Sequence, residues 1–126
     1  MQTAFARTFH VCCGDILVDE SACRCDEPNE GTQMRVGCPK EIKNNEYRVG
    51  LTPGSVREYV AHGHDVIIET NAGLGIDADD GAYQAAGAKI VGSARDVFEQ
   101  SDMIVKVKEP QPSEWAMLRE GQLLYT

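Results

Sequence analysis

Apolar and polar residues alternate from Met34 onward in a pattern that predicts short strands separated by helices. Apolar runs, several of them rich in β-branched residues, predict five strands, at residues 35–38, 65–69, 89–91, 103–107 and 122–125. Apolar positions at helical spacing predict four helices, from Pro53 to about His62, from Asp77 to about Ala86, from Ser93 past Phe98, and from Pro112 to Leu118. Strands that alternate with helices of this length favour right-handed crossovers and a mainly parallel sheet.

The predicted helices have typical capping residues at their ends. Thr52 followed by Pro53 is a strong start signal, and Gly63 is a typical stop signal. Asp77 and Ser93 are expected to cap the next two helices. The expected fold class is therefore α/β, with a Rossmann-like, mainly parallel sheet and flanking helices.

Composition adds limits to this picture. The chain has 126 residues, of which 42% are hydrophobic and 25% charged, as expected for one globular domain. The net charge of -8 argues against nucleic acid or an anionic membrane surface as the main partner. No apolar run approaches the ~20 residues that a membrane-spanning helix needs.

Residues 1–33 differ in composition from the rest and are predicted to form a separate leader. They hold two arginines against six acidic residues, so about a quarter of the chain carries half of the net charge of -8. Four of the five cysteines also lie there, namely Cys12, Cys13, Cys23 and Cys25. Their spacing is not that of a zinc finger, and the leader lacks the pattern of a secretory signal. A disordered or artefactual extension is favoured over a metal, redox or targeting role, and residues 34–126 form the predicted domain.

Two basic side chains are the main candidates for a binding site. Arg48 lies in a predicted turn after the first strand, and Lys108 stands at the carboxyl end of the fourth predicted strand. Open α/β sheets bind ligands at that edge, and an arginine with a second cation suits a small carboxylate. The alternative for Arg48 is a surface ion pair with Glu46 or Glu41. Lys106, one pleat earlier than Lys108, is expected to be structural.

Other motifs favour structural roles. The segment from Gly73 to Gly75 follows a strand and could belong to a dinucleotide-binding motif. That motif also needs an acidic residue at the end of the next strand to bind the ribose, but Asp96, at about the right distance, lies in a predicted helix. A structural turn is therefore favoured over cofactor binding. His62 and His64 flank a predicted helix end, where capping explains them. No metal cluster is predicted, and Cys38 is expected to be a buried strand residue.

Four further motifs stand in residues 34–126, namely M-R-V-G-C-P-K-E-I-K-N-N-E-Y-R-V-G-L-T-P from Met34, E-T-N-A-G-L-G, A-A-G-A and V-K-V-K-E-P. Through these motifs, residues 34–126 resemble the N-terminal domain shared by alanine dehydrogenases and nicotinamide nucleotide transhydrogenases. The motifs K-N-N-E-Y-R and K-V-K-E-P look more like alanine dehydrogenase than like transhydrogenase.

The resemblance implies roles for the two candidates and a reaction. Arg48 matches the arginine that binds the substrate carboxylate, and Lys108 matches the catalytic lysine that contacts the keto or amino group of pyruvate or L-alanine. The family reaction converts L-alanine, NAD⁺ and water to pyruvate, ammonia and NADH. NAD is expected to bind a downstream domain, so no cofactor-binding residue is assigned here. A homo-oligomeric cytoplasmic oxidoreductase of L-alanine catabolism is the expected whole protein, without a membrane or nucleic-acid partner.

The resemblance also implies an incomplete substrate domain. The catalytic histidine and aspartate of the family have no counterpart in this chain, so the fragment by itself is expected to be inactive and to expose apolar surface. Two alternatives stay open. The chain could be the N-terminal segment of a transhydrogenase alpha subunit, or a stand-alone module that binds a 2-oxo acid.

Overall fold

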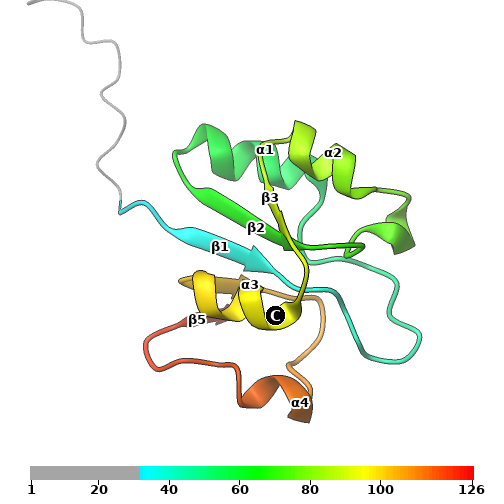
Figure 1. Ribbon diagram of the computed structural model, residues 1–126, viewed down its shortest axis with the longest axis vertical. Coiled ribbons are helices and arrows are strands. Elements are labelled where there is room, and N and C mark those ends of the chain that lie inside the picture. Colours follow the sequence, from blue (N-terminus) through cyan, green and yellow to red (C-terminus); the bar gives the residue numbers. More distant parts are fainter. Residues whose placement is uncertain (1–31) are drawn as a thin grey trace, which may run out of the picture. The chain divides into compact units, whose positions relative to one another are not determined.

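Five parallel strands form the centre of the computed structural model, which describes residues 32–126 (Figure 1). The strands are β1 (Arg35–Cys38), β2 (Asp65–Glu69), β3 (Lys89–Val91), β4 (Met103–Val105) and β5 (Leu123–Tyr125). The helices are α1 (Pro53–Ala61), α2 (Asp80–Ala85), α3 (Ala94–Gln100) and α4 (Pro112–Trp115), with a 3₁₀ turn η1 (Leu74–Ile76). The predicted α/β class and parallel sheet are confirmed. The predictions for the leader and its cysteines lie outside the described residues.

The strand order β3-β2-β1-β4-β5 creates a switch point in the middle of the sheet. From β1 the chain first builds outward through β2 and β3, and then returns to place β4 and β5 on the other side of β1. All four pairings are parallel, so the carboxyl ends of the strands share one edge. The connection after β1 leads to β2 on one side, and the connection after β4 leads to β5 on the other side. This class of sheet binds ligands at the carboxyl edge between two such strands.

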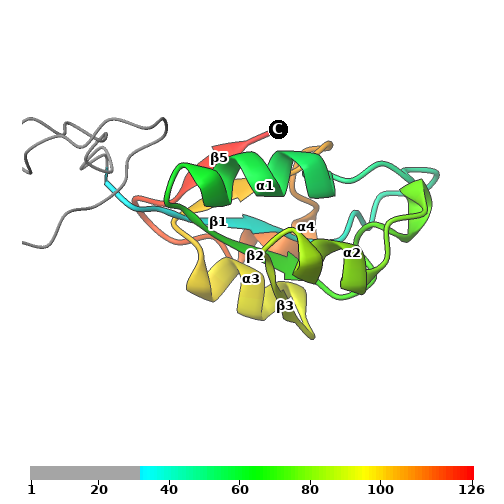
Figure 2. The same ribbon diagram turned by 90° about the horizontal axis from the view of Figure 1, so that it is seen from above.

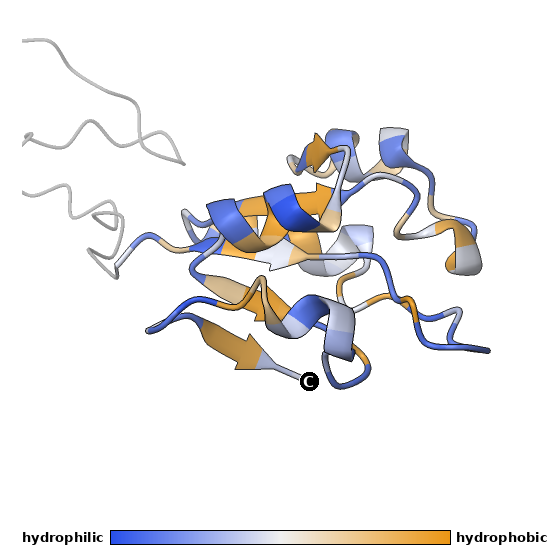
Figure 3. Ribbon diagram, turned by 60° about the horizontal axis from the view of Figure 1, so that its bottom comes forward, coloured by the Kyte–Doolittle hydropathy of each residue, from blue (hydrophilic) through white to orange (hydrophobic). Residues whose placement is uncertain are grey.

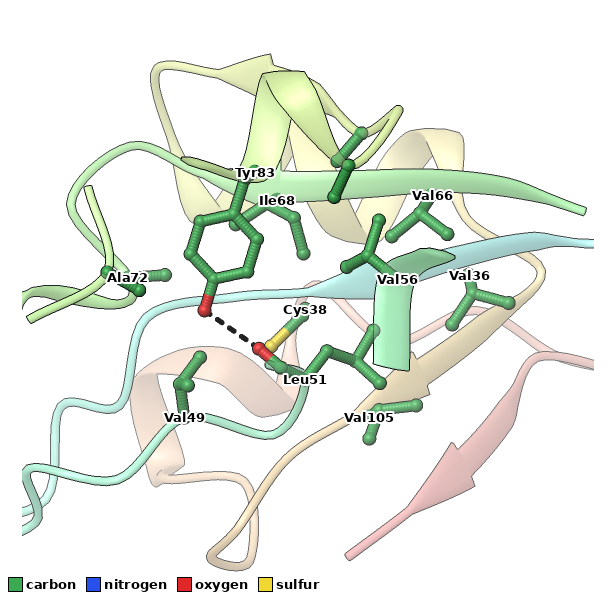
Figure 4. Close-up of a cluster of buried hydrophobic side chains, with 13 residues drawn as sticks. Val36, Cys38, Val49, Leu51, Val56, Val66, Ile68, Ala72, Tyr83 and Val105 are labelled. Atoms are coloured by element: carbon green, nitrogen blue, oxygen red, sulfur yellow. Dashed lines mark hydrogen bonds between the residues drawn. The ribbon is translucent and has the colours of Figure 1, made fainter. Parts of the chain in front are cut away.

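Helices cover both faces of the sheet, as Figure 2 shows for α1 and α3. Alternate strand residues point to opposite faces, so each face has its own apolar cluster. The cluster under α1 and α2 combines side chains of the strands and both helices, including Val36, Cys38, Val66, Ile68, Val56 and Tyr83 (Figure 4). The cluster under α3 contains Ile67, Val97, Phe98 and Ile104. Hydrophobic colouring accordingly concentrates on the strands (Figure 3).

Gly37 lets α3 approach the central strand closely. It lies on β1 between the buried residues Val36 and Cys38, so its missing side chain would point to the opposite face. A Cβ at this position would lie 2.7 Å from the Val97 Cγ1 atom and would also meet the Ser101 side chain. Close packing against α3 therefore requires glycine at this position. Backbone conformation does not require it, because Gly37 has an ordinary strand conformation.

Most predicted helix ends are confirmed. The Thr52 hydroxyl accepts a hydrogen bond from the Ser55 backbone N–H at 3.2 Å, and Pro53 is the first residue of α1. Gly63 follows α1 with a φ of 82°, the left-handed conformation that glycine adopts without strain. Ser93 caps α3 through the N–H of Asp96, as predicted.

The cap predicted at Asp77 is wrong. Asp77 ends the 3₁₀ turn η1 in the left-handed conformation, at a φ of 57°. The side chain of Asp79 instead accepts the N–H of Ala82 at 2.8 Å and begins α2. Asp77 and Asp79 are both typical N-cap residues and lie only two positions apart. Because Asp77 ends η1 in the left-handed conformation, Asp79 is the residue that caps α2.

The fourth strand and the last helix are shorter than predicted. β4 ends at Val105, because the Val107 N–H donates to the Glu41 carboxylate instead of to a neighbouring strand. α4 ends at Trp115, and Met117 and Leu118 then pack against the cluster under α3. The outer strand β5 exposes Leu123, Leu124 and Tyr125, which agrees with the expected apolar surface. Within residues 32–126, no helix has the length and apolar character needed to cross a membrane.

Candidate functional site

The loops after β1 and β4 meet at the switch point of the sheet. The Val107 N–H, just past β4, donates to Glu41 Oε1 at 2.8 Å, and Glu41 belongs to the loop after β1. Lys43 and Glu109 form an ion pair between the same two loops. These contacts bring together the loop that carries Arg48 and the loop that carries Lys108.

Arg48 presents one edge of its guanidinium to Glu46. Its Nε donates to Glu46 Oε1 at 2.8 Å, and its Nη2 donates to Glu46 Oε2 at 2.7 Å. Such a fork is the strongest common geometry for an arginine and a carboxylate. The ion pair with Glu46, one alternative raised by the sequence, is therefore present. Within the described part of the chain no hydrogen bond involves Nη1, and the Arg48 side chain is 66% exposed, so the outer edge of the guanidinium faces solvent.

Lys108 contributes to the same electrostatic environment from the other loop. The hydrogen bonds from Arg48 lower the pKa of Glu46 from 4.5 to about 2, and the charges of Arg48 and Lys108 add to this effect. The Glu46 side chain is only 6% exposed, whereas its partner Arg48 projects outward. The carboxylate of Glu46 is therefore held ionised chiefly by Arg48, and the charge of Lys108 makes the smallest of these contributions. The sequence pattern indicates Glu46 only as an ion-pair partner of Arg48, because the contact that brings the loop of Lys108 close joins residues far apart in the sequence.

A hollow of about 360 Å³ lies beside Arg48 at the carboxyl edge of the sheet. It is lined by residues of the loop after β1 and by the turn after β2, namely Lys40, Glu41, Glu46, Tyr47, Arg48, Asn71, Ala72, Leu74 and Gly75. Lys108 is not part of this lining. A second hollow of about 410 Å³, lined partly by Arg35, Asp65 and Lys89, lies at the amino ends of the strands. We favour the first hollow because ligands of open α/β sheets bind at the carboxyl ends.

The other candidate groups have structural contacts. His62 caps α1, and His64 Nδ1 accepts the Met34 N–H at 3.3 Å. Among residues 32–126 no group of three potential ligands could hold a metal ion. Cys38 is fully buried, and burial raises the pKa of its thiol to about 11, so it stays protonated and unreactive. Lys106 is buried and ion-paired, as the structural interpretation predicted.

The pairing of Glu46 with Arg48 predicts an acid-resistant carboxylate. A carboxylate with a lowered pKa stabilises the fold above its ordinary pKa of 4.5, and this contribution is lost as the pH falls towards about 2. At about pH 3.5 we expect Glu46 to remain ionised while ordinary glutamates are mostly protonated. Carboxyl ¹³C NMR measures this directly. An Arg48→Met variant should titrate near the ordinary value, and a wild-type midpoint near 4.5 would contradict the pairing.

Comparison with known proteins places this geometry in a family. The sequence profile of the family described as "Alanine dehydrogenase/PNT, N-terminal domain" matches residues 37–126. The chain belongs to this family. It is 53% identical over 93 residues to an alanine dehydrogenase of Methanococcus maripaludis and 48% identical over 93 residues to that of Bacillus subtilis, in both cases over 74% of this chain.

Solved structures of the family have the same fold. An L-alanine dehydrogenase superposes with a TM-score of 0.70 at 53% identity, over 72% of this chain. A transhydrogenase from Sinorhizobium meliloti superposes with a TM-score of 0.67 at 37% identity, over 71% of this chain. The chain spans about a quarter of the length of these relatives.

The segment from Gly73 to Gly75 does not fit the phosphates of a dinucleotide such as NAD. A Cβ at Gly75 would collide with the Tyr47 carbonyl group, and a Cβ at Gly73 would meet the Tyr83 ring, so protein atoms fill the space next to both glycines. Asp96 lies in the first turn of α3 instead of at the end of a strand, where a ribose-binding acid would stand. The segment from Gly73 to Gly75 is a close-packed turn, as predicted.

Proposed function

We propose that this chain is the N-terminal, substrate-binding part of an NAD-dependent L-alanine dehydrogenase. The enzyme would convert L-alanine, NAD⁺ and water to pyruvate, ammonia and NADH. One observation carries the proposal. Arg48 and Lys108 stand on the two loops that meet at the switch point of the sheet, and the Val107–Glu41 hydrogen bond and the Lys43–Glu109 ion pair join these loops. Membership of the family supports the same conclusion.

In this proposal the two cations bind opposite ends of the substrate. The outer edge of the Arg48 guanidinium donates two parallel hydrogen bonds to the substrate carboxylate, while Glu46 accepts hydrogen bonds from the inner edge and fixes the plane of the group. The Lys108 ammonium donates a hydrogen bond to the keto oxygen of pyruvate and so polarises the carbonyl. When L-alanine is the bound substrate, the Lys108 side chain contacts its amino group. NAD binding and the remaining catalytic groups belong to residues other than those described here, and a cytoplasmic homo-oligomer is the proposed setting.

The alternative is the corresponding segment of a transhydrogenase alpha subunit. The similarity to the Sinorhizobium meliloti transhydrogenase supports it, at 37% identity against 53% for the L-alanine dehydrogenase. A stand-alone module that binds a 2-oxo acid would use Arg48 and Lys108 without catalysis. The higher identity to alanine dehydrogenases favours the first proposal.

A chimera tests the enzymatic proposal. Residues 34–126 would replace the matching segment of the Bacillus subtilis alanine dehydrogenase, to which they are 48% identical. We expect the chimera to reduce NAD⁺ with L-alanine. Lys108→Ala in the chimera should lower kcat by roughly a thousandfold, because the developing charge on the substrate loses its preorganised cation.

Lys89→Ala provides the matched control. Lys89 is an exposed lysine on β3 that pairs with Gln100 near the opposite edge of the sheet, and its removal should leave kcat unchanged. A folded chimera without alanine-dependent activity would argue for the transhydrogenase or binding-module alternative. A Lys108→Ala chimera with near wild-type kcat would remove Lys108 from the proposed mechanism.

A further inference from the structure

Three charged side chains form a buried cluster, and one of them, Glu41, also lines the hollow beside Arg48. Lys106 Nζ lies 2.7 Å from Glu114 Oε1 and 3.6 Å from Glu41 Oε2. The side chain of Lys106 is 0% exposed, and those of both glutamates are 3% exposed. The cluster joins the loop after β1, the end of β4 and the start of α4. Neither Arg48 nor Lys108 is a member of it.

The second oxygen of each carboxylate holds a backbone group of the same segment. Glu41 Oε1 accepts the Val107 N–H at 2.8 Å, and Glu114 Oε2 accepts the Gln111 N–H at 2.8 Å. These two N–H groups lie on either side of Lys108 in the sequence. The segment between them is therefore fixed at both ends by carboxylates that share one buried ammonium.

Capping of α4 accounts for Glu114, but stability gives no comparable reason for the buried charges of Glu41 and Lys106. Buried charges lose hydration, and apolar side chains of similar volume often stabilise a fold equally well or better. With both glutamates ionised, the cluster also holds one carboxylate more than its single ammonium balances. Glu114 at 2.7 Å is the close partner of Lys106, whereas Glu41 at 3.6 Å is the more distant one. Glu41 differs from Glu114 in a second way, because its hydrogen bond to the Val107 N–H links the loop after β1 to the segment that carries Lys108.

We infer that Glu41, Lys106 and Glu114 are positioning residues that hold Lys108 in register with Arg48. The inference rests on the proposed function, because it takes Lys108 as the substrate lysine. Lys106 orients the two carboxylates, and the carboxylates fix the backbone on both sides of Lys108. Glu41 belongs to the loop that also carries Arg48, so the cluster sets the separation of the two cations that bind the substrate. Because the substrate is small and rigid, its affinity depends strongly on the distance between the charges of Arg48 and Lys108.

Glu41→Ala in the 126-residue chain tests the inference, because it leaves Lys106 and Glu114 as a balanced pair and should preserve the fold. We expect the Val107 amide to exchange its hydrogen on the order of tenfold faster, since its acceptor is lost. Pyruvate affinity, measured by NMR titration, should fall roughly tenfold. Glu41→Gln keeps an acceptor oxygen at the same place and should restore most of both properties.

Asp102→Ala is the matched control. Asp102 also accepts a backbone N–H, from Arg35 at 3.0 Å, and also pairs with a cation, but at the amino edge of the sheet. Its loss should leave both readouts unchanged. Unchanged Val107 exchange in a folded Glu41→Ala variant would overturn the inference, and so would faster exchange with unchanged pyruvate affinity. Wild-type protein that does not bind pyruvate would instead contradict the proposed function, and Val107 exchange would then decide alone whether the cluster holds this segment.

Discussion

Arg48→Met should abolish measurable binding of pyruvate by this chain. A charge-assisted fork between a guanidinium and a carboxylate contributes about 2–3 kcal/mol, so its loss weakens binding by roughly 30- to 150-fold. For a ligand as small as pyruvate the wild-type dissociation constant should be on the order of 1 mM, and such a loss moves it beyond a practical titration. Isothermal titration calorimetry or ligand-observed NMR measures the effect.

Two further variants separate the geometry of the fork from its charge. Arg48→Lys keeps the charge but cannot form two parallel hydrogen bonds, so it should recover only a small part of the affinity. Arg95→Met removes an exposed arginine of α3 that pairs with Glu99, and it should bind pyruvate normally. Equal affinity of the Arg48→Met and Arg95→Met proteins would show that Arg48 does not bind the carboxylate.

Among these variants, Lys106→Met should lower the free energy of unfolding the most. The substitution leaves the buried carboxylates of Glu41 and Glu114 without their cation, and removal of one partner from a buried ion pair costs about 3–5 kcal/mol. The free energy of unfolding, obtained from urea denaturation, should fall by this amount. Lys89→Met, on the exposed side of β3, should change it by no more than about 0.5 kcal/mol.

A compensating variant tests the cause of this loss. In Lys106→Met combined with Glu41→Gln and Glu114→Gln, no buried charge remains, so much of the stability should return. A loss below about 1 kcal/mol in Lys106→Met alone would contradict the assignment of a charged buried cluster. An equal loss in the triple variant would assign the effect to packing instead of charge.

Periodicity and capping residues were sufficient to predict most of the fold. Strands β1, β2 and β3 have the predicted bounds, because β-branched runs and flanking stop signals are local features. The error at Asp77 also has a local origin, since Asp77 and Asp79 offer similar caps. The end of β4 was misplaced because the Val107 N–H finds its acceptor on Glu41, far away in the sequence.

The candidate site could be predicted only in part. Arg48 and Lys108 were recognisable because each follows a predicted strand, and the pairing of Arg48 with Glu46 involves neighbours in the sequence. The cluster around Lys106 could not be predicted, because it depends on where α4 places Glu114 relative to the loop after β1. The role of Arg48 and Lys108 as substrate ligands stays a prediction.

Mapping the pyruvate-binding site by NMR shifts of the backbone amides would test directly whether Arg48 and Lys108 bind the substrate. The ¹⁵N-labelled 126-residue chain would be titrated with pyruvate, with acetate as a control for general carboxylate binding. We expect saturable shifts at the amides around Arg48 and Lys108 that are larger with pyruvate than with acetate, because only pyruvate offers Lys108 a keto oxygen. Shifts confined to the hollow near Arg35 and Lys89, or no saturable shift at all, would contradict this role of Arg48 and Lys108.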